Sequence, residues 1–82
     1  MIGEGIHEEA LAHLVYLHAV REFLVGRDPS GAKWTLSVRL GGPTSRLVAV
    51  RSRREPVRTW SSLTAVGRFA EHLGITGFAV EL

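Results

Sequence analysis

The sequence predicts a single α+β domain covering residues 1–82, with the element order α-β-β-β-α-β. Three observations lead to this prediction. A long stretch near the N-terminus has no internal glycine or proline, residues 33–40 alternate between apolar and polar side chains, and a shorter amphipathic stretch follows Ser61 and Ser62. We therefore expect a long N-terminal helix, a small and mostly antiparallel sheet, a second short helix and a final strand.

The N-terminal stretch, residues 5–25, is predicted to form one helix because helix-forming residues dominate it. Glycine and proline in residues 26–31 end it. At 100° per residue its apolar side chains fall on nearly every side, and such a helix is normally buried all round.

A chain of 82 residues without cysteine has no disulfide to stabilise it. The prediction is a homodimer formed through Leu11, Leu14, Val15 and His18. The alternative is a wide core stripe with a few exposed leucines.

The middle of the chain is predicted to form three strands separated by turns. Trp34, Leu36, Val38 and Leu40 share one face of the first strand. Glycine and proline in residues 41–44 separate it from a second strand over residues 46–51. A turn at residues 53–56 leads to a short third strand over residues 57–59. Both tryptophans, Trp34 and Trp60, flank apolar alternations, which favours a place in the core.

The last third is predicted to form a helix and a strand. Ser61 or Ser62 provides an N-cap, because a serine side chain can accept a hydrogen bond from the first turn. Gly74 has the position and chemistry of a left-handed residue that ends the helix. The expected apolar face comprises Leu63, Val66, Ala70 and Leu73, and the expected final strand alternates through Phe78, Val80 and Leu82.

No residue pattern indicates catalysis or metal binding. The chain has no cysteine, and no serine lies in a nucleophile elbow. His7 and His18 project to similar sides of the predicted helix but lie roughly 16 Å apart along its axis, too far to share an ion. The glycines form neither a phosphate-binding loop nor a dinucleotide fingerprint. We therefore predict a protein that is not an enzyme, with no cofactor, no metal and no small-molecule substrate.

The charge is distributed unevenly along the chain. Residues 1–28 carry five acidic and two basic side chains, whereas residues 29–82 carry eight basic and three acidic ones. The predicted hairpin over residues 46–59 holds the densest group of arginines, which are Arg46, Arg51, Arg53, Arg54 and Arg58. Guanidinium groups suit phosphate geometry, which favours weak contact with nucleic acid. The alternative is an acidic partner protein bound by the same basic surface.

The longest uncharged stretch near the N-terminus, residues 10–20, has eleven residues. A membrane-spanning helix needs about 20 apolar residues, so no membrane segment is predicted. Glu4, Glu8 and Glu9 precede this stretch where a signal peptide has basic residues. The expected location is the cytoplasm.

One segment resembles a known group of proteins. It comprises Val57-Arg58-Thr59-Trp60-Ser61-Ser62-Leu63, then Ala65-Val66-Gly67-Arg68-Phe69-Ala70-Glu71-His72-Leu73-Gly74-Ile75, then Phe78-Ala79-Val80. This succession of an arginine-rich strand, a short helix ending in Leu-Gly-Ile and a last strand resembles small plasmid partition-associated accessory proteins of Gram-negative bacteria. The resemblance covers roughly the last third of the chain. It implies an accessory role in plasmid maintenance, through DNA or through a partner partition protein, and it supplies no catalytic residue.

Overall fold

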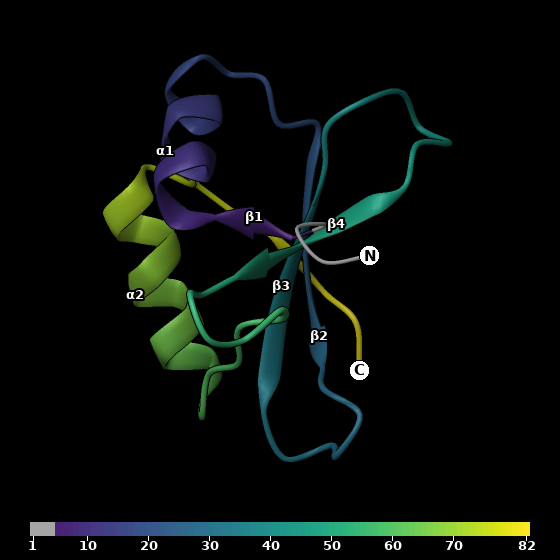
Figure 1. Cartoon of the computed structure of the whole chain (residues 1–82), viewed down its shortest axis with the longest axis vertical. Helices are drawn as coiled ribbons and strands as arrows, with labels where there is room; N and C mark the ends of the chain where they lie inside the picture. Colours follow the sequence, from purple (N-terminus) through teal and green to yellow (C-terminus); the bar gives the residue numbers. More distant parts are fainter. Residues whose placement is uncertain (1–4) are drawn as a thin grey trace.

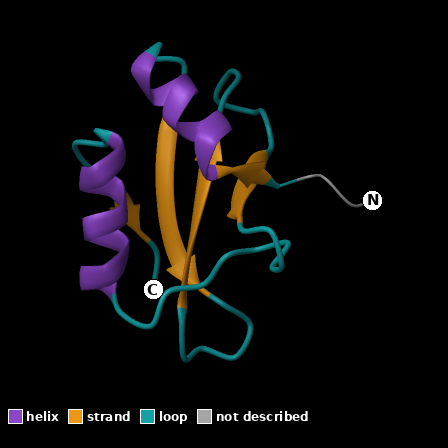
Figure 2. Cartoon of the chain, turned by 60° about the vertical axis from the view of Figure 1, so that its left-hand side comes forward, coloured by secondary structure: helices purple, strands orange, loops and turns teal. Residues whose placement is uncertain are grey.

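The computed structural model describes residues 5–82, which form a five-stranded mixed sheet covered on one face by two helices (Figures 1 and 2). Residues 1–4 of the predicted domain lie outside the described residues. The strands follow the order β1-β4-β3-β2-β5 across the sheet. The two central pairings are antiparallel and the two outer ones are parallel. In chain order the elements are β1 (Ile6–His7), α1 (Glu8–Tyr16), β2 (Glu22–Arg27), β3 (Trp34–Arg39), β4 (Leu47–Arg51), α2 (Leu63–Leu73) and β5 (Ala79–Val80).

The predicted N-terminal helix over residues 5–25 is wrong. Residues 6–7 form an edge strand, the helix covers only Glu8–Tyr16, and residues 22–27 form β2, which lies between β3 and β5 in the sheet. Helix propensity is a weak preference that tertiary context overrides. Here β2 pairs along its whole length with β3, which places Val25 opposite Leu36 on the buried face. The gain from this pairing and burial exceeds the local preference for helix.

The predicted third strand and the mostly antiparallel sheet are also wrong. Residues 57–59 form no strand, and their neighbour Trp60 makes only an isolated antiparallel bridge with Trp34. One edge of β4 pairs with β3 and the other pairs with β1, which runs parallel to it. The returning chain pairs instead with the start of β3, where Trp60 and Trp34 exchange two backbone hydrogen bonds at 2.8 and 2.9 Å, and Arg58 N–H donates to the Val50 carbonyl at 2.8 Å. The element order is therefore β-α-β-β-β-α-β.

The second helix agrees with its predicted ends. The Ser62 side chain accepts a hydrogen bond from the Ala65 amide at 3.1 Å, and Gly74 adopts a left-handed conformation with φ of 86°. The final strand is shorter than expected, since only Ala79–Val80 pairs, in parallel, with β2. Among the residues described, no helix is long and apolar enough to cross a membrane.

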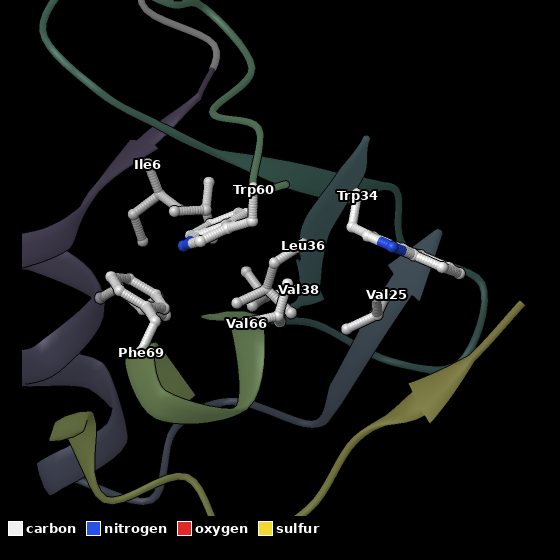
Figure 3. Packing of buried hydrophobic residues seen from close by; sticks show 10 residues of the cluster. Ile6, Val25, Trp34, Leu36, Val38, Trp60, Val66 and Phe69 are labelled. Carbon is white, nitrogen blue, oxygen red and sulfur yellow. The ribbon is translucent and has the colours of Figure 1, made fainter. Parts of the chain in front are cut away.

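The core lies between the helices and the helix-facing side of the sheet (Figure 3). The alternation predicted for β3 is confirmed for Trp34, Leu36 and Val38, which are buried, but Leu40 lies beyond the end of β3 and is 39% exposed. Trp60 is also buried, and its ring lies 5.1 Å from the ring of Phe69 on α2. The full buried cluster contains Ile6, Leu11, Val25, Trp34, Leu36, Val38, Val50, Trp60, Val66 and Phe69. Both helices and strands β1 to β4 therefore share one core.

Candidate functional site

Arg58, one of the predicted binding arginines, packs against the core. Its guanidinium carbon lies 4.9 Å from the centre of the Trp60 ring and 4.8 Å from that of the Phe69 ring. Its Nη1 lies 3.4 Å from Glu8 Oε1 at the start of α1. These contacts are cation–π interactions and an ion pair, both of which hold the side chain in place. Arg58 therefore joins α1, α2 and the 52–59 loop.

Two further arginines have partners within the chain. Arg39 Nε lies 2.7 Å from Glu22 Oε1, directly across the β2–β3 ladder, and its Nη1 donates to the Ser45 carbonyl. The Arg27 guanidinium lies 4.4 Å from the centre of the Trp34 ring and donates to the Gly31 carbonyl. Neither side chain is available to a ligand without giving up these contacts.

The remaining predicted arginines are more accessible. Arg46, Arg53 and Arg54 are exposed, and Arg51 is half-buried. Within residues 5–82, none of these four side chains forms an ion pair with a carboxylate. Arg51 Nε donates to the Ser52 carbonyl at 3.2 Å, so Arg46, Arg53 and Arg54 are the more accessible of the four.

Three of the predicted arginines, Arg51, Arg53 and Arg58, line one cleft of about 320 Å³. The parallel pairing of β1 with β4 places His7 beside Arg51, and α1 begins at the next residue. After β4 the chain turns back through a bond from the Ser52 amide to the Glu55 carbonyl, at 3.0 Å. The other residues lining the cleft are His7, Glu8, Glu9 and Ser52. We call this set of seven residues the arginine cleft.

Gly5, which precedes β1, allows the chain to pass close to Arg51 of β4 and to Pro56 of the 52–58 loop. A Cβ atom there would lie 2.9 Å from Arg51 Cβ and 2.9 Å from the Pro56 carbonyl oxygen. Contacts of a Cβ atom below 3.0 Å are essentially never found in proteins. The Pro56 oxygen belongs to the backbone, so it cannot move aside as the end of a flexible side chain could. A side chain at this position would push the 52–58 loop away from β1.

The structure separates the other two predicted arginines from the arginine cleft. Arg54 lines a different and largely apolar groove, together with Asp28 and Pro56. There a hydrogen bond from the Ser30 hydroxyl lowers the pKa of Asp28 from its ordinary value. Arg46 precedes β4 and lies roughly 17 Å from Arg51 along the strand, at about 3.3 Å per residue. The basic surface predicted for residues 46–59 is thus divided among three places, which are the arginine cleft, the groove beside Arg54 and the start of β4 at Arg46.

The acidic residues of the arginine cleft were not expected from the sequence. Glu8 and Arg58 are fifty positions apart, and their contact depends on the parallel β1–β4 pairing. No local pattern signals such a contact. The cleft holds three arginines against two glutamates, which gives a net charge of +1 with His7 neutral. That arrangement suits a small anionic group.

The residues predicted for a dimer interface occupy different environments. Leu11 is fully buried in the core, and Leu14 and Val15 pack against it. His18 is exposed beyond the end of α1. A second chain therefore cannot contact Leu11 while this fold is intact.

Comparisons with known proteins give no further assignment. No family model, no curated protein and no solved structure matches the chain. In the part of the chain that the structure describes, no three histidine or acidic side chains gather in a way that could hold a metal ion. The arginines and their surroundings are therefore the candidate functional groups of this chain.

Proposed function

We propose that this protein is a non-enzymatic accessory protein of plasmid or DNA maintenance that contacts nucleic acid weakly through exposed arginines. The observation that carries the proposal is the contrast among the arginines. Arg46, Arg53 and Arg54 are exposed and have no carboxylate partner among residues 5–82, whereas Arg39 and Arg58 have one. Unpaired guanidinium groups on loops favour contacts with phosphates.

The positions of these arginines favour binding to DNA of many different base sequences. The arginines lie on loops at the two ends of β4, and β4 itself is paired on both edges. The strand that joins these arginines is therefore not part of a free two-stranded ribbon that could enter a major groove and read base edges. Phosphate contacts alone give dissociation constants of roughly 10⁻⁴–10⁻⁶ M near physiological salt.

The test is fluorescence anisotropy with a labelled duplex over a series of salt concentrations. The double substitution Arg53→Ala with Arg54→Ala should weaken binding and reduce the log–log salt slope by about two, because each arginine neutralises one phosphate. The control is Arg21→Ala with Arg68→Ala, which removes the same charge from two exposed arginines elsewhere. An equal weakening in the control would assign binding to net charge alone. If the unmodified protein binds neither duplex nor single-stranded DNA at low salt, the proposal fails.

A second candidate function is a dimeric module that binds an acidic protein partner. Two large apolar side chains at the end of α1 favour it, because Tyr16 is 80% exposed and Leu17 is 54% exposed. They adjoin a groove lined by Val15 and His18. Leu17→Glu should then convert a dimer to a monomer, since it would bury an unpaired charge. A monomer in light scattering of the unmodified protein at tens of micromolar would exclude this candidate.

A further inference from the structure

The ion pair inside the arginine cleft is loose. Arg58 Nη1 and Glu8 Oε1 are separated by 3.4 Å, and the two side chains are 31% and 45% exposed. Hydrogen bonds between a guanidinium and a carboxylate are usually about 2.7–2.9 Å long. The Glu8 carboxylate therefore lies near Arg58 without making a close bond, and solvent reaches both groups.

Arg58 itself is held in position by other contacts. The rings of Trp60 and Phe69 lie within 5 Å of its guanidinium carbon, and its backbone amide is bonded to the Val50 carbonyl. The guanidinium is therefore fixed at one wall of the cleft whether or not Glu8 is present. A charged group that is already in position loses little conformational freedom when it binds a ligand.

We propose that the arginine cleft holds one phosphate group of the bound nucleic acid, and that Glu8 competes with this phosphate for Arg58. The inference rests on the proposed function and names the place of one contact. Arg51 and Arg53 line the same cleft and form no ion pair with a carboxylate among residues 5–82. Together with Arg58 they can surround an anion that carries several acceptor oxygens. Glu8 supplies a like charge that lowers the affinity for this anion.

Neutralising Glu8 should strengthen binding more than neutralising an acid elsewhere. Glu8→Gln keeps the size of the side chain and removes the charge next to the phosphate. We expect the dissociation constant for duplex DNA to fall roughly fivefold, as the removal of one solvent-screened repulsion at close range would give. The matched control is Glu71→Gln, which makes the same change of charge on an exposed residue of α2 outside the arginine cleft.

The experiment measures duplex binding by anisotropy for the unmodified chain and both variants at one salt concentration. A fivefold gain for Glu8→Gln with less than a twofold gain for Glu71→Gln supports the inference. Equal changes in the two variants overturn it and leave the proposed function standing. If neither the unmodified chain nor either variant binds DNA, both proposals are overturned.

A second measurement does not depend on the folding of a variant. Amide resonances of the unmodified, ¹⁵N-labelled chain are followed during titration with the same duplex. Shifts concentrated at His7, Ser52 and Arg53 support occupancy of the cleft. Shifts confined to residues near Arg46, or to Asp28 and Glu55 in the groove that Arg54 lines, show that the phosphates bind elsewhere, and they overturn the inference without affecting the proposed function.

Discussion

The two helices end with the same hydrogen-bond pattern but different residues. In α2, the amides of Gly74 and Ile75 donate to the carbonyls of Glu71 and Ala70. In α1, the amides of His18 and Ala19 donate to the carbonyls of Val15 and Leu14 in the same spacing. Both ends are Schellman motifs, which require a left-handed residue at the position that Gly74 and His18 occupy.

The left-handed conformation has a different cost in the two helices. Gly74 has φ of 86° and, as glycine, adopts this conformation readily. His18 has φ of 55°, which costs an L-residue with a Cβ atom roughly 1–2 kcal/mol. The C-terminus of α1 is therefore less favourable than that of α2.

The helices also differ at their N-termini and in their buried faces. Ser62 caps α2 with its side chain, whereas His7 makes no side-chain cap for α1. Three residues of α2 are buried, but α1 buries only Leu11. Local residues thus define both ends of α2, whereas α1 depends on tertiary packing. Three substitutions test this difference.

The largest effect is expected in α1 from Leu11→Ala. Leu11 is fully buried, and its truncation removes the main contact of α1 with the core. The free energy of unfolding should fall by about 2–5 kcal/mol, the usual range for a leucine in a packed core. Urea denaturation followed by circular dichroism measures it. Leu17→Ala, at the exposed position that follows α1, should change stability by less than about 0.5 kcal/mol. Similar destabilisation in both variants would contradict the described packing.

An intermediate effect is expected in α2 from Gly74→Val. The β-branched side chain opposes the left-handed conformation and should lower the free energy of unfolding by about 1–2 kcal/mol. Thermal unfolding would report this as a lower melting temperature. An unchanged melting temperature would show that α2 does not end at Gly74 in solution.

The smallest effect, and the only gain, is expected in α1 from His18→Gly. Glycine relieves the left-handed strain but loses more conformational entropy on folding, so stability should rise by no more than about 1 kcal/mol. The control is His13→Gly, inside α1, which should lower stability by about 0.3–0.5 kcal/mol, the difference between the helix propensities of histidine and glycine. If His18→Gly also destabilises the protein, the two helix ends do not differ as described.

The candidate site shows how much of its chemistry could be read from the sequence. The density of arginines between positions 46 and 58 is plain in the sequence, but their individual surroundings are not. Arg58 contacts Glu8 and Phe69, residues that lie far from it in the sequence. Arg54 faces a different groove from its neighbour Arg53. The partners of a charged side chain depend on which distant strands pair, and local composition carries no information about that.

Elements with local signals could be predicted from their residues alone. The alternation of β3 follows from side chains that point to opposite faces of a strand, and the ends of α2 follow from Ser62 and Gly74.

The secondary structure of residues 5–27 and 57–59 depends instead on the tertiary structure. The first segment has residues that suit a helix, yet β2 gains burial and a complete ladder with β3. The second has residues that suit a strand, yet β1 already occupies the edge of β4 that it needed. Competition for a sheet edge is settled between segments distant in sequence, because pairing energy depends on the partner as well as on the strand.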